Sequence, residues 1–473
     1  MLLSFSVFSA SLWLILLSLL SLIVSYLRSS CGFSSSRFPV DLPRVQLVRQ
    51  IAPQPTVADV ASTVREQWLR SKTARRIKPG MRVAVGCGSR GIKNYLAIAK
   101  ATVDALKELG AKPFVVAAMG SHGGATAEGQ RELLASYDLD EAHLDVPVVT
   151  DMDAQNIGAN SWGQPVWWDK NALSADAVVT VSRVKPHTDF RGKFESGILK
   201  MLVIGLGKRH GADQVHSFGP RGLREMLPES GKVILKSTPF IGGLAVLENS
   251  YEETAKLEVV DRDDLWDREP VLLEEARKMM GRLPFKAMDV LVIGECGKNY
   301  SGAGMDPNVI GRMLIEASPE AETNDPKIVR IGVLEVSPES HGNATGIGLA
   351  DLTTNRALAG IDQGPFRMNN LTARSLWRSK LPFAFDTDRA VIEACVETCW
   401  QPEFDKVRLC LIPNTLEVAE LWISAPLVAE AKANPHLQLI GEPIALPFDT
   451  SGTLVQEKLF PHSVRGKRAK AHR

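Results

Sequence analysis

The feature that most limits the fold of this chain is a regular alternation of strand-like and helix-like segments, which begins near residue 82. Strand-like runs lie at residues 82–86, 113–119, 146–150 and 175–182, and helical periodicity covers residues 94–109 and 127–136. The last run, ADAVVTVS, is a continuous β-branched stretch, as expected of a strand buried on both faces. Alternation of this kind favours a parallel sheet with helices on both sides.

A second series of the same kind follows an acidic stretch at residues 261–269 and a helix near residues 272–280, which together look like a connection. Its strands are expected at residues 289–293, 329–336 and 408–412, with helices after Asp306 and at residues 389–400. The length of 473 residues agrees with more than one domain. We therefore expect an α/β fold: two α/β domains with mainly parallel sheets and an inter-domain cleft.

The expected division has four parts. Residues 1–40 are a hydrophobic N-terminal segment and linker, 41–282 an N-terminal domain, 283–445 a C-terminal α/β domain, and 446–473 a C-terminal segment with a basic tail. From His462 to Arg473 this tail holds five of the 55 Lys and Arg residues and no acid, which leaves 50 basic against 54 acidic residues elsewhere. The tail is expected to be a solvated, disordered end, with nucleic-acid or membrane contact as the alternative.

Composition excludes several classes of protein. The chain is 45% apolar and 23% charged with a net charge of +1, which argues against global disorder, a multi-span membrane protein and a nucleic-acid partner. The six cysteines form no CxxC pair, so neither a disulfide framework nor a zinc ribbon is expected. Cys395 and Cys399 share one helix face and are expected to pack in the core. No HExxH, EF-hand, Walker A or G-x-S-x-G motif is present.

The first 27 residues contain no charged side chain, and residues 7–27 are long enough to span a bilayer as a helix. Arg28, Arg37, Arg44 and Arg49 follow this segment, which places the body of the chain on the cytoplasmic side. A cleaved signal, which would export the body, and a true start near Phe38 are the alternatives. We expect a cytoplasmic protein, tethered to the membrane by an N-terminal helix if that segment is retained.

Three loops carry unusual residues at the ends of expected strands, where open α/β sheets bind ligands. They are GCGSRG with Arg90, MGSHGGAT with His122, and RVKPH with His187. Glycines beside His122 allow close backbone approach to a ligand. Each of these residues alone is more often structural, so the argument depends on all three converging at one edge of the sheet, as they do if the strands are parallel neighbours.

Lys200 lies in an apolar, helix-like stretch, where it must either extend to solvent or serve the chemistry as a nucleophilic amine. His216 follows it by 16 residues, and Lys208, Arg209 and His210 between them are expected to form a solvated turn. An arginine can bind a carboxylate with both nitrogens, and two histidines can act as acid and base on opposite faces of a carbon. This combination suggests stereochemical inversion next to a carboxylate.

With these motifs the chain resembles the nickel-dependent lactate racemase family, most clearly over residues 82–219 and more weakly to about residue 440. The correspondence covers Ser89 and Arg90 in C-G-S-R-G, Gly120, His122 and Thr126, Pro186 and His187, and Lys200 and His216 at the spacing of the family's cofactor lysine and nickel-binding histidine. Cys87 and Gly91 replace the family's aspartate and proline. In the second domain Asp306 and Asn308 fit the family pattern, whereas Ile310 and Gly311 replace a tyrosine and a glutamine, and Lys298 and Arg312 are nearby cations.

The resemblance implies a racemase or epimerase of a 2-hydroxy acid that transfers hydride to a nickel-pincer nucleotide. It implies that the domain at 41–282 holds this cofactor, covalently bound through Lys200, with Ser89 in the cofactor site and His216 on the nickel. His122 and His187 are the implied catalytic pair, and Arg90, Lys298 and Asn308 the implied substrate-binding residues. The implied partners are a small hydroxy acid and cofactor-synthesis proteins.

Because of the departures from the family pattern, the substrate can be lactate or a larger hydroxy or sugar acid. Two other classes remain open: a non-nickel hydroxy-acid epimerase or dehydratase of the same fold, and a non-catalytic acid-binding module. The oligomeric state does not follow from the sequence.

Overall fold

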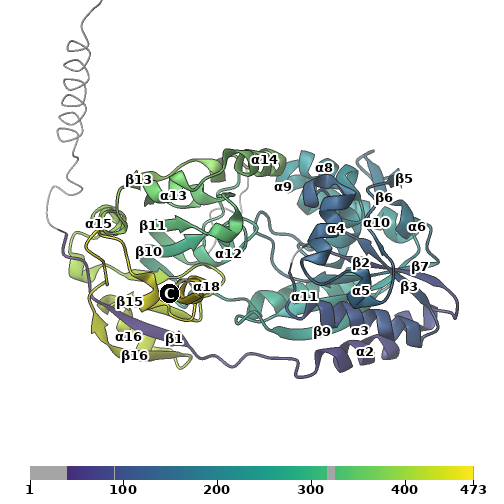
Figure 1. Ribbon diagram of the computed structural model, residues 1–473, viewed down its shortest axis with the longest axis horizontal. Coiled ribbons are helices and arrows are strands. Elements are labelled where there is room, and N and C mark those ends of the chain that lie inside the picture. Colours follow the sequence, from purple (N-terminus) through teal and green to yellow (C-terminus); the bar gives the residue numbers. More distant parts are fainter. Residues whose placement is uncertain (1–39, 90, 317–324, 472–473) are drawn as a thin grey trace, which may run out of the picture.

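The computed structural model describes residues 40–89, 91–316 and 325–471, which form two lobes, each built around one β-sheet (Figure 1). Both sheets are mainly parallel and are covered by helices on both faces. The predicted α/β class is therefore confirmed.

The first lobe contains a six-stranded sheet. In spatial order its strands are β4 (Val148–Val149), β3 (Lys112–Ala117), β2 (Arg82–Cys87), β7 (Ala177–Arg183), β8 (Phe240–Glu248) and β9 (Thr254–Asp261). All neighbours are parallel except β8 and β9, which form an antiparallel pair. Six of the seven residues of β7 are buried, as its β-branched sequence predicts. Because β2, β3 and β7 are adjacent and parallel, the loops that follow them leave the sheet at the same edge.

Helices cover both faces of this sheet. One face carries α2 (Val60–Arg70), α3 (Tyr95–Glu108) and α5 (Glu141–Leu144); the other carries α6 (Lys170–Leu173), α7 (Ile198–Lys200), α8 (Lys208–Ser217), α10 (Leu227–Ser237) and α11 (Leu265–Met279). The lobe also contains α4 (Ala127–Ala135), which packs on the first of these faces through Leu134, α9 (Gly219–Arg221) and the hairpin of β5 (Ala154–Ala159) and β6 (Pro165–Asp169).

The second lobe contains an eight-stranded sheet. Its order is β13 (Phe383–Phe385), β12 (Leu352–Thr354), β11 (Lys327–Val336), β10 (Ala287–Cys296), β14 (Leu409–Ile412), β15 (Glu420–Ser424), β1 (Val45–Gln50) and β16 (Leu437–Ile444). The first five strands are parallel and the last three antiparallel. One face packs on α12 (Pro307–Ile310), α13 (Asn355–Ala359), α14 (Gln363–Ala373) and α16 (Ala425–Ala433), and the other on α15 (Asp388–Thr398) and α17 (Gln456–Leu459). Cys395 and Cys399 lie buried in the α15 core, as expected.

The strand β1 does not belong with the N-terminal domain to which the sequence division assigned it. It lies in the second sheet between β15 and β16, and the chain then crosses to α2 in the first lobe (Figure 1). Val45 and Val48 are fully buried in the two cores on opposite faces of that sheet. The partners of β1 lie more than 370 residues away in the sequence, so no local pattern could place it. The other domain boundaries stay predictions.

Lys208 is fully buried, which corrects its assignment to a solvated turn; Arg209 and His210 are exposed. Its Nζ lies 2.8 Å from the carboxylate of Asp169, which is also fully buried, and donates a hydrogen bond of 2.7 Å to the carbonyl of Ala117. This pair joins the end of β3 to the end of β6.

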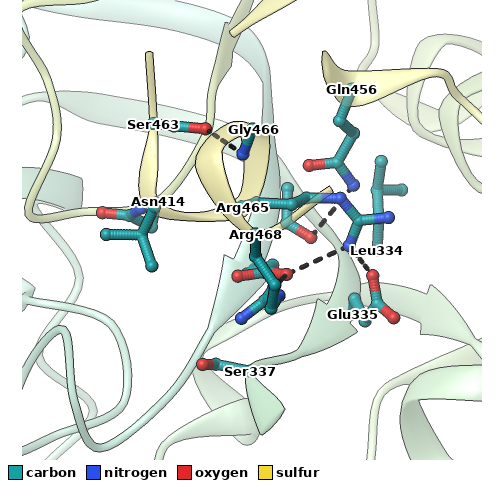
Figure 2. A network of polar contacts seen from close by, with 12 residues as sticks. Leu334, Glu335, Ser337, Asn414, Gln456, Ser463, Arg465, Gly466 and Arg468 are labelled. Carbon is teal, nitrogen blue, oxygen red and sulfur yellow. Dashed lines mark hydrogen bonds and ion pairs between the residues drawn. The ribbon is translucent and has the colours of Figure 1, made fainter. Parts of the chain in front are cut away.

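The described part of the C-terminal tail departs from the prediction of a solvated end, because α18 (Val464–Ala471) lies against the second sheet. Figure 2 shows Arg465 of this helix directed at Glu335, near the end of β11. Arg465 lies 3.0 Å from the carboxylate of the buried Glu295 and also pairs with Glu335, while Arg468 pairs with Glu295 and Glu339. The basic residues thus neutralise an acidic edge of their own chain.

Removal of both arginines tests this docking. In the double variant Arg465→Ala, Arg468→Ala, Glu295 stays buried without a cationic partner, so the free energy of unfolding should fall by about 3–5 kcal/mol. Urea denaturation measures it. Lys467, exposed on the same helix, is the matched control, and Lys467→Ala should leave stability nearly unchanged. Equal stability of the two variants would contradict the structural role.

No helix within the described ranges is long and apolar enough to cross a membrane. The apolar segment at residues 7–27 lies outside those ranges, so the N-terminal anchor stays a prediction.

Candidate functional site

The loops that follow β2, β3 and β7 meet on the helix that carries Lys200. This helix, α7, continues directly into a π-helical turn, Met201–Gly205. Gly88 packs so closely on this turn that a Cβ at its position would lie 2.8 Å from the Met201 side chain. Gly120, at φ +59°, donates its N–H to the carbonyl of Gly205 at 3.0 Å. The glycines therefore let the loops approach the Lys200 helix.

His187 lies against Lys200: its Nε2 is 2.5 Å from the Nζ atom. The backbone N–H of Asp189 donates to His187 Nδ1 at 3.0 Å, and the backbone N–H of His187 donates to the buried carboxylate of Glu195 at 2.6 Å. Burial, and then the charge of Lys200, hold the pKa of His187 well below its usual range. His187 is therefore neutral at neutral pH.

The backbone N–H of Asp189 occupies Nδ1 of His187, so the ring nitrogen that faces Lys200 is Nε2. A lysine amine held at this position is the kind of group that can form a covalent bond with a cofactor.

His216, near the end of α8, belongs to the same group of side chains. Burial, followed by the charge of Lys200, lowers its pKa to about 4. A neutral imidazole is the form that binds metals. Among the described residues no three His, Cys, Asp or Glu side chains form a group that could hold a metal ion.

The first two loops are joined through Ser89 and His122, whose Oγ and Nδ1 atoms are in hydrogen-bond contact. His122 is exposed. The buried amide of Gln130 holds its loop by donating to the carbonyls of Gly120 at 3.0 Å and His122 at 3.2 Å. Arg90, the predicted carboxylate-binding residue, lies outside the described residues.

The second lobe reaches this site through Asn308. Its amide donates to the carbonyl of His187 at 3.3 Å and accepts from Arg191. Lys298 donates to the carbonyl of Gly302 in its own loop at 2.7 Å. Arg312 is paired with Asp351 at 2.9 Å, which gives it a structural role.

Sequence reasoning missed Arg378, a buried residue of the second lobe that binds the His187 loop. Its guanidinium donates to the carboxylate of Asp189 at 2.6 Å, and to the carbonyls of Thr188 and Met313 at 2.7 Å each. Burial alone would raise the pKa of Asp189, but Arg378 and His187 outweigh it and hold that pKa well below its usual range. Arg378 stands 189 residues from its partner, and no local signal marks it.

Glu269 of α11 was also missed, because its surroundings were interpreted as a connection. Its buried carboxyl accepts the backbone N–H of Leu199 at 3.0 Å, at the start of the Lys200 helix. A Cβ on Gly197 would lie 2.2 Å from the other carboxyl oxygen, so a larger residue there would displace the Glu269 carboxyl. Burial raises the pKa of Glu269 to about 8, so the carboxyl is largely protonated at neutral pH.

Two cavities lie near the junction of the lobes. One, of about 60 Å³, is lined by Lys185 and Pro186 of the His187 loop and by Asp306 and Thr415 of the second lobe. The other, of about 490 Å³, lies near Tyr251 and Phe460. None of the predicted site residues that the structure describes lines either cavity.

The fold and the site define a two-lobed α/β protein with a lysine and two histidines gathered at the strand ends of its first sheet. Residues 33–220 match the family model described as lactate racemase N-terminal domain. This part of the chain is therefore similar to the N-terminal domain of lactate racemases.

Among solved structures, the chain is similar to the lactate racemase apoprotein from Thermoanaerobacterium thermosaccharolyticum. The two share 13% sequence identity at a TM-score of 0.48, over 78% of this chain and 94% of the other. No curated protein sequence matches the chain.

The Glu269 carboxyl makes a pH-dependent contribution to stability. Because its pKa is raised on folding, the folded state binds the extra proton, and stability should fall as pH rises from the ordinary value of 4.5 to about 8. The slope should approach about 1.4 kcal/mol per pH unit. Glu269→Gln should lose this slope in urea denaturation, while Glu274→Gln, at an exposed position of the same helix, should keep it. A slope shared by both variants would contradict the assignment.

Proposed function

We propose that this chain is a racemase or epimerase of a 2-hydroxy acid and that it works with a nickel-pincer nucleotide bound covalently to Lys200. The observation that carries the proposal is the contact between the Lys200 amine and Nε2 of a neutral His187, in a domain of the lactate racemase N-terminal family. Lactate and larger hydroxy or sugar acids are the candidate substrates.

The described residues fit this cofactor. Lys200 offers a half-buried amine for the covalent bond, and His216 offers a neutral imidazole for the metal. A pincer nucleotide brings its own metal donors, which agrees with a site where His216 is not part of a larger ligand cluster in the described chain. When bound, the group supplies a hydride acceptor and donor for the α carbon of the substrate.

The side chains of the site handle the substrate and its proton. His187 and His122 are proposed to accept the hydroxyl proton of the substrate and to return it, one for each face. When the hydroxyl group loses its proton and the α carbon loses a hydride, the substrate becomes a planar keto acid. Return of the hydride to the opposite face of the α carbon, and of the proton to the oxygen, inverts the centre. Burial keeps His187 neutral and hence able to act as a base.

Substrate and cofactor need further contacts. Arg90 is proposed to bind the substrate carboxylate with both guanidinium nitrogens. Asn308 and Lys298 are proposed to contact the substrate from the second lobe. Asn308 already donates a hydrogen bond to the carbonyl of His187. Ser89 is proposed to contact the cofactor and to orient His122.

The covalent bond is tested first. In protein produced together with cofactor-synthesis proteins, peptide mapping by mass spectrometry should find the adduct on Lys200. Lys200→Ala should lose both adduct and nickel. Lys193→Ala is the matched control, because Lys193 is exposed over the rings of Phe194 and Trp266, and it should keep both. An active protein with unmodified Lys200 and no nickel would overturn the proposal in favour of the non-nickel epimerase or dehydratase.

The histidines are tested by measuring nickel and turnover together. His122→Ala and His187→Ala should each lower turnover by about 10²–10⁴-fold, the usual contribution of a positioned acid or base, with nickel content near normal. His216→Ala should lose nickel itself. Arg90→Ala should mainly weaken substrate binding. His210, exposed on the same helix as His216 with its ring against Trp167, is the control, and its alanine variant should behave like the parent. Intact turnover in both of the first two variants would refute the roles.

A further inference from the structure

The loop that follows β10 carries both of the substrate contacts proposed for the second lobe, Lys298 and Asn308. It comprises residues 297–308 and is called the β10 loop below. The backbone N–H of Gly297 donates to the carbonyl of Gly304 at 2.9 Å, which closes the loop on itself. The contacts that attach this closed loop to the sheet therefore decide where its two polar side chains lie.

Tyr300 joins the β10 loop to the sheet. Its side chain is buried, and its hydroxyl donates to Oε2 of the buried Glu295, near the end of β10, at 2.6 Å. Burial and the charge of Glu295 raise the pKa of Tyr300 well above its usual range, so the hydroxyl stays protonated and remains a donor. Tyr300 also lines the cavity of about 60 Å³, together with Lys185 and Pro186 of the His187 loop. Tyr300 therefore connects the edge of the second sheet with the junction of the lobes.

The other oxygen of Glu295 is bound by helix α18. Nη1 of Arg465 lies 3.0 Å from Oε1 of Glu295, and Arg468 pairs with the same oxygen; both arginines are drawn in Figure 2. One carboxylate oxygen thus accepts from α18 and the other from the β10 loop. Glu295 is only 1% exposed, and a buried carboxylate that is bound on both oxygens has little freedom to turn. Helix α18 therefore fixes the acceptor of the Tyr300 hydroxyl.

A second set of contacts joins α18 to the other end of the β10 loop. The backbone N–H of Val464, the first residue of α18, donates to the carboxylate of Glu417 at 3.1 Å. Two residues before Glu417, the hydroxyl of Thr415 accepts the backbone N–H of Asp306 at 2.9 Å. The Asp306 carboxylate in turn accepts the side-chain amide of Asn308 at 2.8 Å. Both ends of the β10 loop are thus held by contacts that continue to α18.

We propose that Tyr300 is a positioning residue of this site, because it holds the β10 loop on a carboxylate that α18 fixes. This role rests on the proposed function, since it concerns how Lys298 and Asn308 are placed on the hydroxy acid. Tyr300 acts on the binding of that acid and not on proton transfer. The loop of His187 keeps its own attachment through Arg378 when the Tyr300 hydroxyl is lost.

Hydrogen exchange of the full chain without cofactor or substrate, read by mass spectrometry, tests the attachment independently of activity. Tyr300→Phe keeps the ring and removes the hydroxyl. Because a hydrogen bond to a charged acceptor is lost, peptides covering residues 297–308 should exchange about 10–100-fold faster. Tyr251→Phe is the matched control, since the Tyr251 hydroxyl donates to the carbonyls of Gln50 and Ala52 instead. It should leave these peptides unchanged.

The contribution of α18 is tested by the same measurement on Arg465→Ala with Arg468→Ala. Residues 297–308 should again exchange faster, because Glu295 is no longer fixed. Adding Tyr300→Phe to this variant should have a smaller effect than in the parent chain, since both changes act through one carboxylate. Lys467→Ala, which removes an exposed charge from the same helix, should leave these peptides unchanged. Full additivity of the two effects would contradict the link through Glu295.

Kinetics separate positioning from a general loss of folded protein. A panel of lactate and larger hydroxy or sugar acids identifies the acid that the cofactor-loaded parent protein racemises. For that acid, Tyr300→Phe should raise KM by about 5–10-fold, with kcat and nickel content near those of the parent. Tyr251→Phe should keep both kinetic constants.

Unchanged exchange of residues 297–308 in Tyr300→Phe would overturn the proposal. A lower kcat at unchanged KM would also overturn it, since a smaller folded fraction gives that result. A parent protein without a Lys200 adduct or turnover contradicts the proposed function instead, and the exchange measurement then still decides whether Tyr300 holds the loop.

Discussion

The ion pair between Arg378 and Asp189 is the interaction on which the arrangement of the site depends. It lies at the junction of the two lobes and fixes the loop that begins with His187. The backbone N–H of Asp189 then donates to His187 Nδ1, which leaves Nε2 facing Lys200. Through this chain of contacts a residue of the second lobe orients the imidazole that meets the lysine of the first.

Burial gives this site groups that are neutral at neutral pH, although it is rich in basic residues. His187 and His216 both have lowered pKa values, first because of burial and then because of Lys200. Burial also raises the pKa of Glu269, whose carboxyl lies at the start of the Lys200 helix. A neutral imidazole is the form of histidine that can accept a proton.

The carboxyl edges of the two sheets serve different purposes. In the first lobe that edge carries the loops with Ser89, His122 and His187. In the second lobe the ends of β10 and β11 are acidic, and the chain's own helix α18 covers them with Arg465 and Arg468 (Figure 2). The second lobe reaches the site instead through Asn308 and Arg378.

The sequence by itself determined the two β-α series, the loops at the ends of β2, β3 and β7, and the apolar helix around Lys200, because periodicity and strand-end positions are local properties. Only the tertiary structure decided where β1 pairs, that Lys208 is buried on Asp169, and that α18 is docked. It also showed that Glu269 supports the Lys200 helix and that Arg378 holds the His187 loop. Each of these depends on a partner distant in the chain, and charge pairing of that kind leaves no pattern in the neighbouring residues.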